Sequence, residues 1–202
     1  MREPALNITQ INADSESFAF LKSEPDLYAK SNSKPIKIAF VDRDGTIIWE
    51  PERPSDVDPR ETFPLTSAGQ VRFLTDAIDG LKLLLDKGFK LVLVTNQTFL
   101  GTPKHPQVTF DQVMDRMLGE LKKQGVEFDF IMVCPHGPDD GCDCRKPKIG
   151  GVKTYLEKRP NVSLSASLMF GDRATDGEFA KNLGVRFVEQ ETNGPFVAPN
   201  DI

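Results

Sequence analysis

The chain has 202 residues, of which 39% are hydrophobic and 27% are charged, and its formal net charge is −5 at pH 7. This length suits one domain with a substantial core, and the acidic balance gives no general attraction to nucleic acid or to an anionic membrane. No apolar run approaches the ~20 residues of a membrane span, the N-terminus lacks a signal-peptide pattern, and three closely spaced cysteines make a poor disulfide framework. We therefore expect a cytoplasmic protein that binds any anionic ligand through a local site.

The beginning of the chain differs in composition from the remainder. Residues 1–34 are polar and rich in Ser, Asn, Asp and Glu, which predicts an extension ahead of a domain at residues 35–202. Within this extension, Phe18, Phe20 and Leu21 suggest a short helix that docks on the domain.

From residue 36 onward, apolar runs alternate with amphipathic segments. Buried strands are predicted at residues 36–41, 89–95, 128–133, 167–170 and 185–188. Helices are predicted at residues 76–88, 109–125, 151–158 and 176–183, the second opening with Thr109 and Gln112 at capping-box spacing. Apolar strands alternating with helices favour an α/β fold: a Rossmann-like parallel sheet with helices on both faces.

Polar segments follow four of these strands directly. They are DRDGT (42–46), TNQ (95–97), CPH (134–136) and GDR (171–173). Ligands of open parallel sheets bind beyond the carboxyl ends of the strands. We therefore expect these segments to meet in one site.

DRDGT alone could be a simple turn, since Asp and Gly are common turn residues. Together with Thr95, Lys146 and GDRATD (171–176), in this order, it resembles the four motifs of the haloacid dehalogenase superfamily. The resemblance implies a capless haloacid-dehalogenase-like fold and a phosphatase.

The same resemblance implies a role for each motif residue. Asp42 would be the nucleophile and a Mg²⁺ ligand. Asp44 would be the general acid and base, with its backbone carbonyl on Mg²⁺. Asp172 would complete the Mg²⁺ site, with Asp176 as a candidate outer-sphere partner. The phosphoryl oxygens would be held by Thr95, Asn96 and Lys146.

These residue types suit the chemistry. A carboxylate that attacks phosphorus forms an aspartyl-phosphate and divides a very slow hydrolysis into two easier steps. A hard cation such as Mg²⁺ reduces the repulsion between that carboxylate and the phosphate by accepting oxygen ligands from both.

All three cysteines lie within eleven positions, beside one of the two histidines. Cys134, His136, Cys142 and Cys144 form C-x-H-x5-C-x-C, a Cys₃His set that suits tetrahedral Zn²⁺ with no open position, and hence a structural ion. The alternative is a reduced, metal-free loop. Ordering this loop would bring Arg145 and Lys146 to the phosphate.

The other histidine, His105, lies among prolines and is expected to be a solvated loop residue.

The segment 134–150 resembles the zinc-loop phosphatases, which comprise histidinol-phosphate phosphatase and heptose-bisphosphate 7-phosphatase. GDRATD and the short spacing between His136 and Cys142 are more similar to the first, which implies hydrolysis of L-histidinol phosphate to L-histidinol in histidine biosynthesis. Segments 51–72 and 98–101 depart from the family pattern.

Several alternatives stay open. They are the heptose bisphosphate, another small phosphate ester, and a non-catalytic zinc-binding interaction module. Glu50 either contacts the ammonium group of histidinol phosphate or is a solvated loop residue. We expect a small-molecule substrate and neither nucleic acid nor membrane as partner, while the oligomeric state is open.

Overall fold

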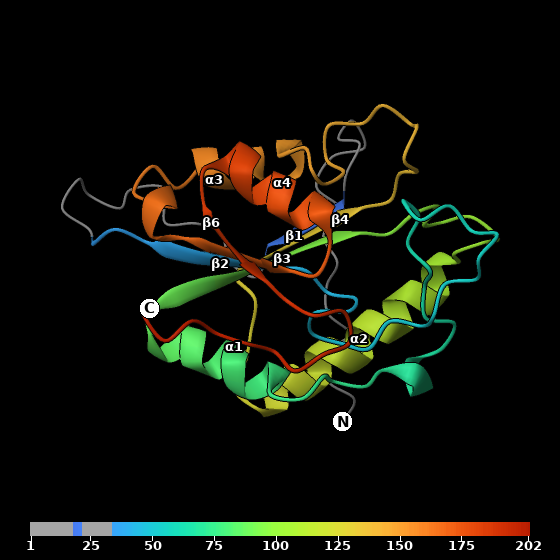
Figure 1. Ribbon diagram of the computed structural model, residues 1–202, viewed down its shortest axis with the longest axis horizontal. Helices are drawn as coiled ribbons and strands as arrows, with labels where there is room; N and C mark the ends of the chain where they lie inside the picture. The colour runs from blue at the N-terminus through green and yellow to red at the C-terminus, as the bar shows by residue number, and fades with distance from the viewer. Residues whose placement is uncertain (1–17, 22–33) are drawn as a thin grey trace, which may run out of the picture.

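The computed structural model describes residues 18–21 and 34–202, and its central element is one six-stranded sheet (Figure 1). The strand order is β1-β4-β3-β2-β5-β6. Five strands run parallel: β2 (Lys37–Val41), β3 (Phe89–Asn96), β4 (Phe130–Cys134), β5 (Leu168–Gly171) and β6 (Arg186–Glu189). The predicted parallel α/β sheet is confirmed.

Helices cover both faces of this sheet (Figure 1). One face carries α1 (Ala77–Asp86) and α2 (Gln107–Lys123), and the other carries α3 (Gly150–Glu157) and α4 (Ala174–Leu183). Neighbouring residues of β2 accordingly enter different cores: Ala39 and Val41 belong to one apolar cluster, Ile38 and Phe40 to the other. Burial on both faces explains why β2 to β5 are largely apolar, whereas the edge strand β6 has exposed residues at Arg186 and Glu189.

The strand β1 (Phe18–Leu21) comes from the polar N-terminal segment. It pairs antiparallel with β4, with Phe18 opposite Val133 and Leu21 opposite Phe130. Residues 18–21 thus pair with the domain as expected, but the helix predicted around them is wrong. The backbone N–H and C=O groups along the outer edge of β4 need partners, which a strand supplies and a helix does not.

The start of α2 also differs from the prediction. The helix begins at Gln107 after Pro106, and no side chain caps it, so the capping box at Thr109 and Gln112 is wrong. Thr109 lies in the first turn, where its N–H donates to the carbonyl of Pro106. A proline at this position has a fixed φ that suits the approach to a helix.

Between β2 and α1, residues 51–72 contain one short 3₁₀ helix, η1 (Ala68–Gln70), and no domain of regular structure. A second 3₁₀ helix, η2 (Leu164–Ala166), precedes β5. Among the residues that the structure describes, no helix has the length and apolar character needed to cross a bilayer.

Candidate active site and metal cluster

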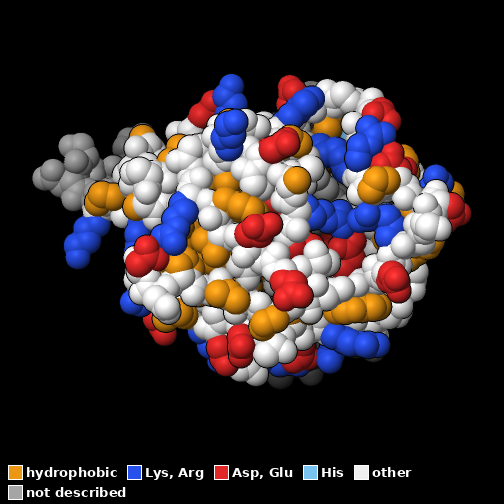
Figure 2. All heavy atoms as spheres, viewed as in Figure 1, with side chains coloured by type: hydrophobic (Ala, Val, Ile, Leu, Met, Phe, Trp, Pro, Cys, Tyr) orange, Lys and Arg blue, Asp and Glu red, His pale blue; other side chains and the backbone are white. Residues whose placement is uncertain are grey.

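A cavity of about 1090 Å³ lies at the carboxyl ends of the parallel strands. Figure 2 shows it as a hollow with basic side chains at its rim and acidic ones within. All the predicted catalytic and phosphate-binding residues line it: Asp42, Asp44, Glu50, Thr95, Asn96, Arg145, Lys146 and Asp172. The topology thus brings three of the four polar segments together at the cavity, whereas CPH (134–136) supplies residues of the Cys/His cluster and only the following Gly137 and Pro138 line the cavity.

The turn after β2 places Asp42 close to the segment that follows β5. Asp42 donates its backbone N–H to the carbonyl of Phe170 at 2.9 Å. Gly45 has a φ of +75°, and a Cβ there would lie 2.6 Å from Oδ2 of Asp172. Only glycine permits both this conformation and this approach, which explains the glycine of DRDGT.

Asp42, Asp172 and Asp176 form an acidic cluster whose carboxylate oxygens lie within 4.8 Å of one another. Thr192 donates a hydrogen bond to Asp172 at 2.8 Å and Thr46 does so at 3.3 Å, which fixes that carboxylate. Three converging hard oxygens fit Mg²⁺, which combines a few carboxylates with water and substrate oxygens. Asp176, which we expected as an outer-sphere partner, belongs to this group by position.

Lys146 is buried between two of these carboxylates. Its Nζ lies 2.6 Å from Oδ1 of Asp42 and 2.7 Å from Oδ1 of Asp176. Burial raises the pKa of Asp42 to about 6, although Lys146 opposes the shift. Burial alone would lower the pKa of Lys146, but Asp176 and Asp42 outweigh it and raise that pKa. The lysine therefore stays charged beside the predicted nucleophile.

The pKa of Asp172 is also raised, chiefly by burial and then by the charge of Asp42. Closely spaced carboxylates repel one another when all of them are ionised, which raises their pKa values. A divalent cation between them favours the ionised forms and lowers those pKa values again.

Asn96 and Arg145, both predicted to contact the phosphate, form hydrogen bonds with other residues of the protein in this structure. The side chain of Asn96 exchanges two hydrogen bonds with the backbone of Lys146, at 3.0 and 3.2 Å. The guanidinium of Arg145 donates to the carbonyls of His136 and Arg60 and to the hydroxyl of Thr98. Both side chains line the cavity and hold its wall together.

The carboxylate of Asp44 is held by two side chains that do not line the cavity. Its carboxylate accepts hydrogen bonds from the buried guanidinium of Arg43 and from the amide of Gln97, which also donates to Thr95. Neither Arg43 nor Gln97 stands at a motif position with assigned chemistry, so the sequence does not predict their contacts with Asp44.

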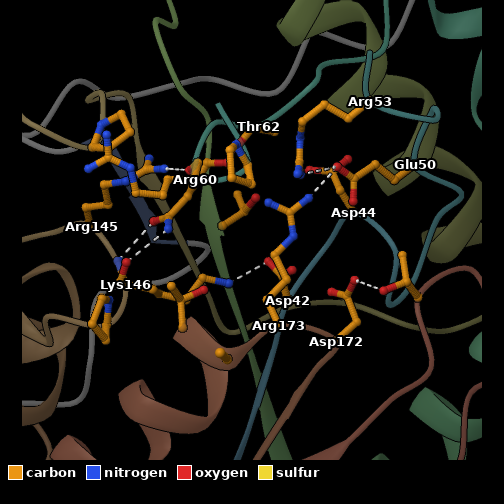
Figure 3. A pocket seen from close by; sticks show the side chains of 18 of the residues that line it. Asp42, Asp44, Glu50, Arg53, Arg60, Thr62, Arg145, Lys146, Asp172 and Arg173 are labelled. Carbon is orange, nitrogen blue, oxygen red and sulfur yellow. Dashed lines mark hydrogen bonds and ion pairs between the residues drawn. The ribbon is translucent and has the colours of Figure 1, made fainter. Parts of the chain in front are cut away.

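Glu50 is 4% exposed, so the solvated-loop alternative is wrong. Its Oε1 forms an ion pair with Arg173 and lies 3.7 Å from Nη2 of Arg53 (Figure 3). Burial raises the pKa of Glu50, although Arg173 opposes the shift. Arg173 projects from the start of α4 into the cavity. It stands within GDRATD, but the sequence does not predict its ion pair with Glu50.

The predicted zinc ligands also converge. Atoms of Cys134, His136, Cys142 and Cys144 that could bind a metal all lie within 4.8 Å of one another. Sγ of Cys134 lies 3.7 Å from Sγ of Cys142, and Nδ1 of His136 lies 3.3 Å from Sγ of Cys144. A tetrahedral ion with Zn–S bonds of ~2.3 Å needs ligand separations of ~3.8 Å, so the cluster fits Zn²⁺.

The thiols of this cluster differ in acidity: the hydrogen bond with Cys134, together with burial, raises the pKa of Cys144. A hydrogen bond from Cys144 lowers the pKa of the Cys134 thiol to about 6, and burial opposes that shift. Metals bind thiolates, and the cluster already favours one.

The loop that carries the Cys/His cluster, residues 134–148, contacts segment 51–72 at the cavity mouth. Arg60 forms an ion pair with Asp139 of the loop at 2.9 Å, and its carbonyl accepts from Arg145. Thr62 donates to the carbonyl of Asn96 at 2.5 Å, which ties this segment to the end of β3.

His105 is 2% exposed, so the expectation of a solvated residue is wrong. Its Nδ1 lies 3.2 Å from the carbonyl of Thr98, and its ring packs edge-on against Phe110. The turns of segment 98–105 bring it back onto α2, which flanking prolines in the sequence do not predict.

Comparisons with known proteins agree with this geometry. The model of the family described as polynucleotide kinase 3 phosphatase matches residues 37–193. The histidine biosynthesis bifunctional protein HisB of Actinobacillus pleuropneumoniae serotype 3 (strain JL03) is 41% identical over 150 residues, which cover 74% of this chain and 39% of that protein. HisB of Campylobacter jejuni subsp. jejuni serotype O:23/36 (strain 81-176) is 42% identical, with 74% and 40% covered. The chain thus spans about two fifths of the length of these relatives.

Solved structures show the same fold. D,D-heptose 1,7-bisphosphate phosphatase from B. bronchiseptica, complexed with magnesium and phosphate, has a TM-score of 0.62 and 30% identity, over 75% of this chain and 79% of that one. A HAD-like protein from Mesorhizobium loti has a TM-score of 0.64 and 23% identity, over 86% of this chain and 78% of that one. The chain therefore belongs to the polynucleotide kinase 3 phosphatase family and has the haloacid-dehalogenase-like phosphatase fold, as the resemblance in its motifs implied.

Proposed function

We propose that the protein is a Mg²⁺-dependent phosphomonoesterase that acts through an aspartyl-phosphate on Asp42. The observation that carries this proposal is the convergence of Asp42, Asp172 and Asp176 beside the buried Lys146 in an open cavity. A reactive carboxylate, two further oxygen ligands and a fixed positive charge are the groups that phosphoryl transfer needs.

In the first step, an oxygen of Asp42 attacks phosphorus, and the bond from phosphorus to the ester oxygen breaks. The leaving alkoxide takes a proton from Asp44. In the second step, water attacks phosphorus and gives a proton to Asp44, the bond to Asp42 breaks, and inorganic phosphate leaves. Mg²⁺ held by Asp42, Asp172 and Asp176, with the carbonyl of Asp44, would neutralise charge on the phosphoryl oxygens.

Thr95 and Lys146 are the proposed phosphoryl contacts. Asn96 and Arg145 support them, since Asn96 holds the backbone of Lys146 and Arg145 holds the wall of the cavity. The Cys₃His cluster supplies the scaffold for this wall: we assign it a structural Zn²⁺, because four protein ligands leave no position for substrate.

The substrate that we propose is L-histidinol phosphate, in the cytoplasm. The similarity at 41–42% identity to proteins named for histidine biosynthesis supports it. Glu50 supports it as well, because it offers a carboxylate within the cavity for the ammonium group of this substrate.

The second candidate is a heptose bisphosphate. The related structure with magnesium and phosphate supports it, as do the basic residues along the cavity, which would suit a second phosphate. These residues are Arg53, Arg60, Arg145, Lys148 and Arg173.

The test is a substrate panel at saturating Mg²⁺. It contains histidinol phosphate, heptose 1,7-bisphosphate, a 3′-phosphorylated oligonucleotide and p-nitrophenyl phosphate. The proposal predicts the highest kcat/KM for histidinol phosphate. A preference for the bisphosphate would establish the second candidate, a preference for the oligonucleotide would overturn the small-molecule assignment, and no Mg²⁺-dependent hydrolysis at all would overturn the enzyme.

A further inference from the structure

Arg43 lies directly between two predicted catalytic aspartates and is itself 1% exposed. Asp42 and Asp44 line the cavity, whereas Arg43 does not. Its guanidinium packs on the opposite side, where Nη1 lies 3.3 Å from the sulfur of Met114 and Cζ lies 5.3 Å from the centroid of Phe110, both on α2. Arg43 therefore does not contact a substrate in the cavity.

The guanidinium nevertheless reaches Asp44. Nη2 lies 2.8 and 2.9 Å from the two carboxylate oxygens, and Nε lies 3.1 Å from each. Because each nitrogen is almost equally far from both oxygens, the carboxylate lies across the guanidinium and not parallel to it. Both oxygens are restrained at once.

Gln97 completes the arrangement. Its side chain is fully buried, its Oε1 accepts from Nη2 of Arg43 at 3.0 Å, and its Nε2 donates to Oδ2 of Asp44 at 2.8 Å. Gln97 is fixed in turn by its backbone N–H, which donates to the carbonyl of Cys134 at 2.7 Å. Asp44 is thus held by two side chains that are anchored to α2 and to β4.

Stability alone does not account for a buried arginine at this position. Replacing a buried ion pair by apolar residues is often neutral or stabilising, because desolvating two charges costs several kcal/mol. The surroundings of Arg43 on α2 are apolar and would accept a methionine or leucine. A group that must transfer protons in a fixed geometry, by contrast, benefits from such restraint, since small misplacements reduce rates strongly.

We propose that Arg43 and Gln97 are positioning residues that hold the carboxylate of Asp44 where it can pass protons to and from the reacting oxygens. This inference rests on the proposed function. The guanidinium acts through Asp44 and makes no contact with substrate.

The test uses Arg43→Met and Arg43→Lys, with Arg116→Met as a matched control. Arg116 is an arginine on the surface of α2, paired with Glu120 at 3.0 Å and far from full burial. Two substrates separate the steps: an alkyl phosphate needs a proton on its leaving group, whereas p-nitrophenolate leaves without one. Hydrolysis of the aspartyl-phosphate needs Asp44 with both.

Arg43→Met should lower kcat for the alkyl phosphate about 100-fold, with KM changed less than about threefold. With p-nitrophenyl phosphate, rapid mixing should show a burst of one p-nitrophenolate per site at close to the wild-type rate, followed by slow turnover. Arg43→Lys keeps the charge without the two-nitrogen contact and should recover part of the loss. Arg116→Met should behave as wild type.

Equal losses in the burst and in steady turnover would overturn the inference, because Arg43 would then support the fold or the attack. Unchanged turnover would overturn it as well. If Arg43→Met does not fold, Arg43→Lys and Gln97→Met carry the same test, with a predicted loss of about tenfold confined to steady turnover. An inactive wild type would instead refute the proposed function.

Discussion

Glu50→Gln tests how the substrate is chosen. The change removes one negative charge and keeps the size of the side chain, at a position where the side chain is 5% exposed. An ammonium–carboxylate contact in such a site contributes ~1.5–3 kcal/mol as a charge-assisted hydrogen bond. We therefore predict that kcat/KM for histidinol phosphate falls about ten- to a hundredfold. Arg173 and Arg53 lose their partner in the variant and then repel the ammonium group, which acts in the same direction.

Steady-state kinetics at saturating Mg²⁺ with histidinol phosphate and p-nitrophenyl phosphate measure this effect, and the second substrate should change little. Glu52→Gln is the matched control. It makes the same change in net charge at an exposed residue that lines the same cavity, so its effect should stay below about twofold. An equal loss with both substrates would refute the reasoning, since Glu50 would then act by holding Arg173.

The remaining predictions concern proton transfer, the metals and pH. Asp44→Asn should lower turnover by ~10²–10⁴-fold, the usual contribution of proton transfer, and activity within tenfold of wild type would contradict its role. Mild EDTA should remove Mg²⁺ and activity together, reversibly, while elemental analysis still finds one zinc per chain; fresh, active protein without zinc would rule out the metal assignment. Without Mg²⁺, Asp42→Asn should be more stable than wild type at pH 7. Because burial raises the pKa of Asp42 to about 6, the folded state binds its proton more tightly than the unfolded state and loses stability as pH rises from about 4 to 6. Denaturant unfolding across this range should show the advantage of the variant growing with pH, and a constant difference would contradict the shift.

The sequence predicts the sheet and its ligand edge well because both depend on local patterns. The strands β2 to β5 are largely buried apolar runs, Asp42 and Asp172 directly follow β2 and β5, and Thr95 lies near the end of β3. The Cys₃His spacing was equally informative, since its ligands are close in the chain and meet with little help from the fold.

The contacts that the sequence could not supply join residues far apart in the chain. Glu50 pairs with Arg173 across 123 positions, and Arg43 meets Gln97 across 54. The strand at residues 18–21 depends in the same way on a distant surface, that of β4, whereas His105 is buried by nearby residues of its own turn and of α2. A local sequence pattern assigns such residues to a loop or a helix, because the pattern does not include the distant residues that they contact.

The covalent phosphate on Asp42 is tested by acid quenching during turnover. Wild-type protein mixed with Mg²⁺ and excess substrate is denatured in acid within milliseconds, digested and examined by mass spectrometry. We expect a phosphoryl group on the peptide that contains Asp42, absent without Mg²⁺ and absent from Asp42→Asn, which should also lack turnover once deamidation to Asp is excluded. Full activity in Asp42→Asn, or a phosphoryl group on another residue, would contradict it.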